Sequence, residues 1–486
     1  MVSKHPSKHD LVTAYERGCP RAAYESMIDK TPPGLALRRI FVEGNAVDTL
    51  ARDSIFSDGV TVTTPDVGQA AAETSALMAD DSVVRINQAT FVAPGGESTR
   101  LDSIVRTGEK WSHEEVKSGT DAKDKYVYDA LVSTDRAKRA GLDVDEVRLV
   151  TLNRNWRLGD LPEVLFQYTD ITHRIEDPEI VGLLSRTYAA LQNGKVPAAS
   201  LVPGCWKCEY FPSCFGEVEY PITLLKRLGK VRILALSQQG VVDIRDIPSI
   251  FDLTNGQRET INSALNGQEH VNRDRLEESL GGLDEPVRHL DFEWSGFAVP
   301  LHTDVAPWGA VTTQYSIHLE AQDGLEHTEY LSEAEGDGRR ELAERMIQEL
   351  GEEGSIVVYS IGAERGRIRD MARWFPDLAD QLVAIENRLF DLEALVKNCL
   401  IYPQFFGKSS LKLVLPVIVP GSGYDDLEVT DGEDAMGAMN LMMRGQIPAE
   451  KVPELRKQLL RYCERDTEAT VRILQALREK VVGGGE

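Results

Sequence analysis

The chain has 486 residues and a formal net charge of −24 at pH 7, and this length allows two or three domains with cores of their own. The sequence has no apolar run near the about 18 residues that a membrane span needs, and its polar start, MVSKHPSKHD, is unlike a signal peptide. We therefore expect a cytoplasmic protein without membrane contact. The acidic charge argues against non-specific coating of DNA, but it is compatible with sites that bind divalent cations.

The first part of the chain alternates helical and strand-like patterns. We predict helices over 10–30, 40–55, 123–140 and 176–193, and strands within 83–117, 149–153 and 164–172. The following segment, 216–285, has mostly helical patterns interrupted by polar breaks such as LTNGQ. It is expected to form a small connector.

At RHLDFEW the pattern returns to apolar strands. We predict strands at 289–294, 313–319 and 355–360, and helices at 339–350, 364–373, 378–398 and 450–480. This alternation predicts the α/β fold class, with a first domain over 1–215 and a second over 286–486.

The segment STRLDSIVRTGEKWSHEEVKSGT reads as a β-hairpin with a Gly108-Glu109 turn. Counting outward from the turn places Asp102 opposite Glu115, and Lys117 shares the face of Glu115. Two carboxylates suit Mg²⁺ or Mn²⁺, and the lysine would position water or stabilise a phosphate. The alternative is a surface hairpin with an exposed ion pair.

The six cysteines are distributed in a pattern that suggests a metal site rather than disulfides. Cys205, Cys208 and Cys214 fall within ten residues, and Cys19 is the candidate for a fourth thiolate. Zinc and a 4Fe-4S cluster both accept four thiolates; a lone distant cysteine plus a tight triplet favours the cluster. Cys399 and Cys463 lie in half-apolar helical patterns, which favour buried free thiols.

Cys19, the D…ExK hairpin and C-x2-C-x5-C together resemble the iron–sulfur RecB-type nucleases of the PD-(D/E)XK superfamily, over roughly residues 8–215. This resemblance implies that Asp102 and Glu115 are metal ligands and that Lys117 is catalytic. It also suggests Asp48 of Gly44-x3-Asp48 as a further ligand. At the glutamine of the family's later Q-x3-Y motif this chain has Ser133.

The second half places acidic residues in another recurrent order. In HLDFEW, Asp291 and Glu293 face the same side of a strand, and Tyr462 and Asp466 are neighbours on one face of a helix. Glu364 comes between them, just after an apolar strand. Two acids on an apolar strand are costly unless they bind something, although single acids on helices are usually solvated.

The order D-x-E, acid, Y-x3-D resembles the DEDDy exonucleases of the ribonuclease H-like fold, over about residues 287–478. The resemblance implies two metal ions held by four acids, with a tyrosine that orients the attacking water. Those residues are Asp291, Glu293, Glu364, Asp466 and Tyr462. The middle motif here is Ser360-x3-Glu364-x3-Ile368, and Lys408 and Lys412 follow in a loop where they are candidates for phosphate contacts.

The whole chain also resembles an uncharacterised bacterial family that fuses these two domains, including the run FFGKSSLKLVLPVIVP. We therefore expect a PD-(D/E)XK-like domain and a ribonuclease H-like domain joined by the connector. The expected activity is metal-dependent cleavage of single-stranded or frayed DNA, 3′→5′ in the second half, in repair or defence by analogy. The alternatives are an RNA exonuclease, a nucleic-acid-binding scaffold with inactive sites and a structural zinc protein.

Overall fold

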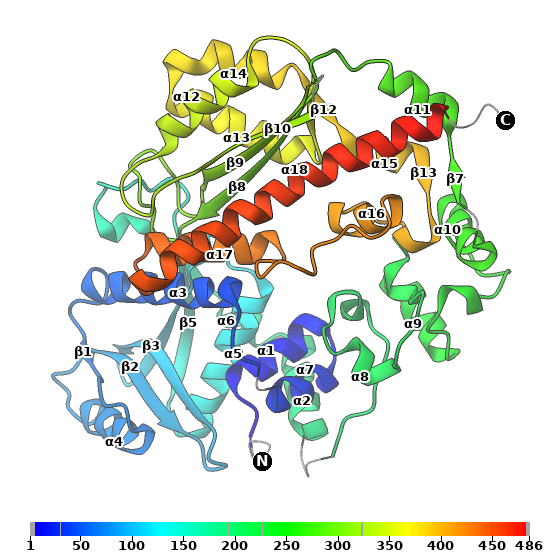
Figure 1. Ribbon diagram of the computed structural model, residues 1–486. Coiled ribbons are helices and arrows are strands. Elements are labelled where there is room, and N and C mark those ends of the chain that lie inside the picture. Colours follow the sequence, from blue (N-terminus) through cyan, green and yellow to red (C-terminus); the bar gives the residue numbers. More distant parts are fainter. Residues whose placement is uncertain are drawn as a thin grey trace.

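Two mixed β-sheets organise the computed structural model, which describes residues 5–29, 31–191, 195–225, 227–267, 269–321 and 324–482 (Figure 1). The α/β class is confirmed. Among the described residues, no helix combines the length and the apolar character needed to cross a membrane.

The first sheet has six strands in sequence order. Its strands are β1 (Val60–Thr61), β2 (Arg85–Val92), β3 (Ser98–Thr107), β4 (Lys110–Val116), β5 (Val144–Leu152) and β6 (Phe166–Asp170). β2, β3 and β4 form an antiparallel meander, and β4 pairs parallel with β5. The crossover between β4 and β5 contains α5 (Asp124–Arg139), as parallel neighbours require.

The other helices of this half are α1 (Lys8–Arg17), α2 (Pro20–Ile28), α3 (Leu35–Asp53), α4 (Val67–Met78), α6 (Thr172–Ile175) and α7 (Pro178–Leu191). The helix predicted over 10–30 is wrong in one respect, because it is two helices. Gly18 ends α1 in the left-handed conformation at a φ of 65°, and Pro20 at the start of α2 lacks the N–H that a continuous helix would use. The break leaves Cys19 as the N-cap of α2.

The segment between the sheets is mostly helical, as expected, and runs along one side of the molecule (green in Figure 1). Within the predicted connector, 216–285, lie α9 (Lys230–Gln238), α10 (Asn255–Asn266) and α11 (Arg273–Leu280), and α8 (Phe211–Phe215) comes just before it. A short strand, β7 (His270–Val271), pairs with β13 (Leu400–Ile401) of the second half.

The second sheet has the order β10-β9-β8-β11-β12. Its strands are β8 (Arg288–Gly296), β9 (Ala310–Ala321), β10 (Gly324–Leu331), β11 (Ile356–Val358) and β12 (Leu389–Asp391). β9 is antiparallel to its neighbours β8 and β10, whereas β11 is parallel to β8 and β12. β8 is therefore the central strand.

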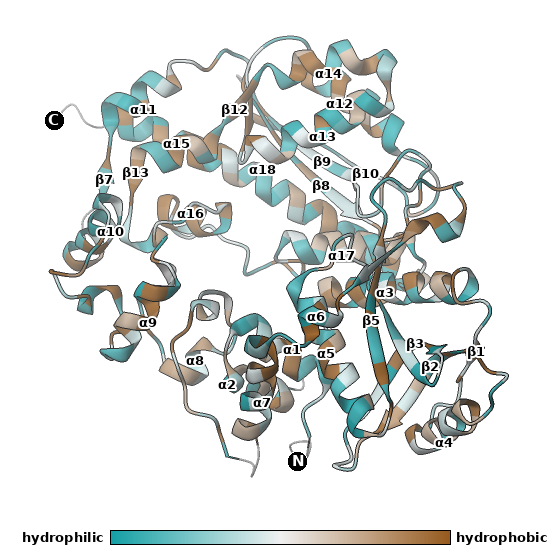
Figure 2. Ribbon diagram, turned by 180° about the vertical axis from the view of Figure 1, so that it is seen from behind, coloured by the Kyte–Doolittle hydropathy of each residue, from teal (hydrophilic) through white to brown (hydrophobic). Residues whose placement is uncertain are grey.

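The helices of the second half are α12 (Arg339–Leu350), α13 (Ile361–Trp374), α14 (Ala379–Glu386), α15 (Leu392–Cys399), α16 (Leu411–Ile418), α17 (Gly432–Met443) and α18 (Val452–Val482). α18 packs across β8 and β9 (red in Figure 1). Figure 2 shows apolar and polar segments alternating along α18, which matches its one buried face.

The single helix predicted over 378–398 is wrong. It is interrupted by β12, which pairs with β11, and Asp391 then caps α15 by accepting a hydrogen bond from the Ala394 N–H at 2.9 Å. Helical periodicity continues through this region, so tertiary pairing decides the structure. The sequence reasoning also missed β10, α4, α16 and α17.

The two halves are joined by a buried carboxylate. Glu43 on α3 is fully buried and accepts hydrogen bonds from Asn440 and Arg444 at 2.9 Å and from the Ala298 N–H at 2.6 Å. Because α3 also carries Asp48, the first candidate site is attached directly to the second half.

Candidate active sites

The β3–β4 hairpin has the predicted register. Ser103 pairs with Glu114, so the next pair in the same register is Asp102 and Glu115. Gly108 has a φ of 69° and Glu109 is not among the described residues with positive φ, which fits the predicted type II′ turn.

Asp102, Glu115 and Lys117 line one cavity of about 670 Å³ together with Asp48 from α3. Three further lysines line the same cavity: Lys8, Lys123 and Lys125. Trp308 also reaches it from the second half, with its indole N–H donating to the Ser118 carbonyl. The predicted residues of the first site therefore lie together, in a hollow that presents both signs of charge.

The Glu115 carboxylate is surrounded by donors. Its oxygens accept hydrogen bonds from Lys117 at 2.8 Å and Lys8 at 3.0 Å, and His113 Nε2 lies 3.0 Å away. Asp129 on α5 forms ion pairs with both lysines, at 3.1 Å to Lys8. Burial disfavours the charged form of Glu115, but Lys117 and Lys8 outweigh burial and hold its pKa well below the usual range.

The pKa of Asp102 is shifted in the opposite direction to that of Glu115. Its Oδ2 accepts the Val116 N–H at 2.8 Å, yet burial, followed by repulsion from Glu115, raises the pKa of Asp102 to about 8. Asp48 is paired with Arg52, and burial still raises the pKa of Asp48. One carboxyl group with a lowered pKa and two with raised pKa values thus share the cavity.

The later helix of this site, α5, contributes Asp129 rather than Ser133. Ser133 is buried on α5 and does not line the cavity. Asp129, one turn earlier on the same helix face, reaches the catalytic-lysine candidate Lys117 instead. Sequence reasoning missed Asp129 and Lys8; the i, i+4 spacing of Asp129 and Ser133 was the available signal for the former.

The second site forms where β8 faces α18. One carboxylate oxygen each from Asp291, Glu293 and Asp466 lies within 4.8 Å of the other two. The first two share a face of the central strand, and Asp466 comes from the helix that crosses it. The structure therefore brings together three of the four acids predicted for this site.

Glu364 lies in the first turn of α13, after β11. It is outside the tight group of three among the described residues, but it acts electrostatically on Asp291 and Glu293. Its Oε2 is buried without a hydrogen-bond partner in the described part of the chain. Burial, then repulsion from Asp391, raises the pKa of Glu364 to about 7.

The pKa values of the three clustered acids are all raised in the absence of a cation. Burial and then repulsion from Asp466 raise the pKa values of Asp291 and Glu293 well above the usual range. Burial also raises the pKa of Asp466. A divalent cation relieves the repulsion between close like charges, and hard oxygen ligands suit Mg²⁺ or Mn²⁺, so the donor set fits these ions.

Two tyrosines and a lysine border these acids. Tyr424 donates a hydrogen bond to Asp466 Oδ1, and Tyr462 also hydrogen-bonds to Asp466. Lys412 Nζ lies 4.7 Å from the centre of the Tyr462 ring and 5.2 Å from that of Tyr424. Of the two lysines predicted to contact phosphate, Lys412 is at the site, on α16. Tyr424 was missed, because nothing in its loop sequence, GSGYDD, marks it.

The cysteine site is assembled from the two ends of the first half. Cys19, Cys205, Cys208 and Cys214 line one small enclosed cavity. Gly204 allows this approach, because a Cβ on Gly204 would lie 2.2 Å from the Arg17 carbonyl oxygen. Burial raises the pKa of Cys205 to about 11, with added repulsion from Cys19. Cys399 and Cys463 are buried free thiols, as predicted.

The chain is similar to a domain family of unknown function and to uncharacterized proteins. Residues 288–410 match a family described as Domain of unknown function (DUF2779). The matched range contains Asp291, Glu293 and Glu364 but ends before Tyr462 and Asp466.

Two relatives carry no assigned function. The uncharacterized protein MG366 homolog of Mycoplasma pneumoniae is 25% identical over 211 residues, covering 39% of this chain and 32% of that protein. The uncharacterized protein MG366 of Mycoplasma genitalium is 21% identical over 213 residues, covering 40% and 32%. The chain thus spans about a third of the length of the relatives that it matches.

Proposed function

We propose that the protein is a metal-dependent nuclease whose second half trims single-stranded or frayed DNA from the 3′ end. One observation carries the proposal: Asp291, Glu293 and Asp466 converge within 4.8 Å on the central strand and the helix that crosses it. The resemblance to DEDDy exonucleases gives this convergence a chemical meaning, and the unpartnered oxygen of Glu364 adds a fourth acid.

Divalent cations held by these acids would activate the attacking water and stabilise the leaving 3′ oxygen. Side chains of the protein would orient the water and neutralise the phosphate. Tyr462 lies against Asp466, where its hydroxyl would orient water. Lys412 lies beside both tyrosine rings, where its charge would neutralise part of the phosphate.

The first half is proposed as a second nuclease centre, with Asp102, Glu115 and Asp48 as candidate ligands and Lys117 as the catalytic lysine. The four lysines at the cavity would attract a phosphate backbone locally despite the acidic surface. The four-cysteine site is proposed to hold a 4Fe-4S cluster that ties residues near position 19 to the 205–214 segment.

The exonuclease proposal is tested with purified full-length protein, Mn²⁺ and 5′-labelled single strands. Asp291→Asn and Asp466→Asn should abolish stepwise shortening, while Glu326→Gln, an exposed acid on β10, should leave it intact. Undiminished degradation by both site variants would reject the assignment. DNA and RNA strands assayed side by side decide the substrate, and strand binding without cleavage by the wild type would favour a scaffold.

The cluster proposal has its own test. Protein purified without oxygen should be brown and contain iron and sulfide, and Cys205→Ser should lose the colour while Cys399→Ser keeps it. A colourless wild type with one zinc per chain would instead support a structural zinc site.

A further inference from the structure

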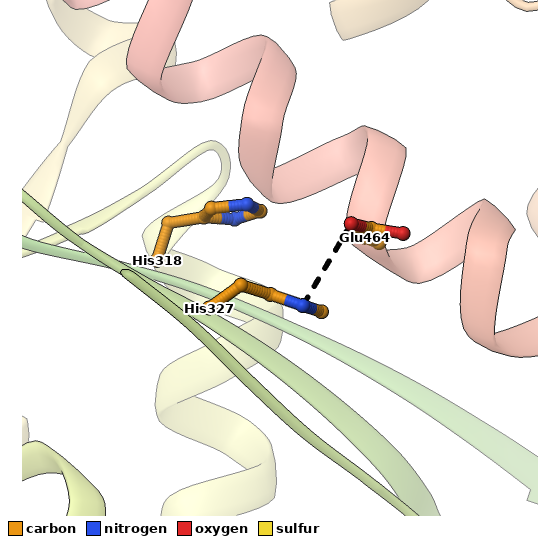
Figure 3. A group of neighbouring side chains, drawn as sticks. All are labelled: His318, His327 and Glu464. Carbon is orange, nitrogen blue, oxygen red and sulfur yellow. Dashed lines mark ion pairs between the residues drawn. The ribbon is translucent and has the colours of Figure 1, made fainter. Parts of the chain in front are cut away.

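Two histidines and a glutamate outside the nuclease carboxylates face a common point. His318 on β9 and His327 on β10 are directly opposite in the strand register, so their side chains share the face of the sheet that α18 covers. Glu464 projects from α18 toward them (Figure 3). One ligand atom from each of the three lies within 4.8 Å of the others.

Each histidine uses one ring nitrogen for the protein and leaves the other for a ligand. His318 Nδ1 is 2.8 Å from the Thr467 hydroxyl, which leaves Nε2. His327 Nε2 is 2.9 Å from the Ser316 hydroxyl, which leaves Nδ1. Histidines that bind metals are commonly held in this way, with the second nitrogen fixed by a neighbouring polar group.

The hydroxyls that hold the rings also hold each other. Ser316 and Thr467 are 2.7 Å apart, so a continuous chain of contacts orients both imidazoles. The rings stack with centroids 4.5 Å apart. Little rearrangement is then needed to bind an ion, because the ligands are already oriented.

The distance between the free ring nitrogen of His327 and the Glu464 carboxylate suits a bound metal ion better than a direct hydrogen bond. His327 Nδ1 and Glu464 Oε1 are 3.7 Å apart, beyond hydrogen-bonding range. Metal–ligand bonds of about 2.1 Å place tetrahedral ligand atoms about 3.4 Å apart. On the same face of β10, Glu329 offers an Oε2 that is buried without a partner among the described residues, a candidate for an additional ligand.

We infer that His318, His327 and Glu464 form a transition-metal site, distinct in chemistry from the all-oxygen site of Asp291, Glu293 and Asp466. Imidazole nitrogens select ions such as Zn²⁺ or Co²⁺ over Mg²⁺. Because Glu464 and Asp466 lie two residues apart on α18, the ion would tie the helix that bears Asp466 to β9 and β10. The inference does not depend on nuclease activity.

The test titrates full-length protein with Co²⁺ and follows its ligand-field absorption. Co²⁺ bound by nitrogen and oxygen lacks the intense thiolate charge-transfer bands that binding at the cysteines would produce, so the two sites are read separately. His318→Gln, His327→Gln and Glu464→Gln should each weaken this binding by at least about tenfold. Glutamine retains a group that can meet Thr467 or Ser316, and melting curves in metal-free buffer check that each variant folds.

Two controls make the result specific. His270→Gln changes an exposed histidine on β7 and Asp291→Asn removes an oxygen ligand of the neighbouring site; both should keep the nitrogen-type spectrum. The same three site variants should lose the rise in Tm that Zn²⁺ gives the wild type. Unchanged Co²⁺ affinity in both histidine variants, or no nitrogen-type spectrum in the wild type, would overturn the inference and leave a stacked histidine pair with a structural role only.

Discussion

The two carboxylate sites differ in what neutralises them. At the first, Lys8 and Lys117 pair with Glu115 and Asp129, and Arg52 pairs with Asp48. At the second, the contacts of Asp291, Glu293 and Asp466 among the described residues come from a thiol, two tyrosines and the nearby charge of Lys412.

This difference indicates how each site would respond to a cation. The first is balanced by the protein's own lysines, so a metal must compete with Lys8 and Lys117 for Glu115. The second has three acids in repulsion and no ion pair from the described lysines and arginines to them, so a divalent cation has more to stabilise there. We therefore expect exonuclease activity to depend on the second site.

The largest expected effect is on catalysis. Asp291→Asn or Asp466→Asn should lower 3′→5′ degradation by about 10³-fold, since several kcal/mol of charge stabilisation would be lost. Asp102→Asn should leave that activity within a few-fold of wild type. Gel assays on single-stranded DNA check both. Loss of the activity in Asp102→Asn alone would show that it depends on the first site instead of the second.

The next effect is on stability, with opposite signs at the two sites. Glu115→Gln should lower the free energy of unfolding by about 2 kcal/mol, because it removes one of the two carboxylates that pair with the half-buried Lys117 and Lys8 and leaves only Asp129. Glu293→Gln should raise it in metal-free buffer, because one of three repelling acids is removed. Chemical denaturation in EDTA measures both, and a loss of stability in both variants would contradict the assigned charge balance.

Stability should also depend on pH through Asp102. Its pKa is about 8 in the folded protein and about 4 when unfolded. The folded state therefore binds the proton more tightly, and this contribution is complete below about pH 4 and lost as the pH rises to about 8.

Asp102→Asn should consequently unfold less readily than the wild type at pH 8, by about 1 kcal/mol or more, with the advantage vanishing near pH 4. Melting in metal-free buffers at several pH values tests this. A constant offset at all pH values would show that Asp102 is already ionised.

The smallest expected effect concerns Tyr424. Removing the hydroxyl that donates to Asp466 by Tyr424→Phe should lower exonuclease activity by about tenfold, in line with one hydrogen bond to a charged group. Tyr330→Phe, which removes a hydroxyl bound to Glu341 on the sheet edge, is the matched control and should keep full activity.

Local patterns predicted much of the candidate sites. The hairpin register of Asp102 and Glu115 followed from the turn position, and the i, i+4 spacing placed Tyr462 and Asp466 on one helix face. Lys8, Asp129 and Tyr424 were missed because their roles arise from long-range contacts, such as the pairing of residues 8 and 115. The break at β12 was missed for the same reason, since only its pairing with β11 distinguishes it from a helix.

The histidine pair could not be predicted either, because the sequence does not reveal the register in which β9 pairs with β10. The convergence of Cys19 with the later triplet was expected from the cysteine spacing, but its physical basis was not. It depends on the bare backbone of Gly204 against Arg17.

The most direct test of the account is a crystal structure of the full chain soaked in Mn²⁺, with anomalous scattering collected to locate the ion. We expect manganese between Asp291, Glu293 and Asp466, at higher occupancy than beside Asp102 and Glu115. A map with no manganese at the Asp291 site, in crystals where that face is open to solvent, would contradict it.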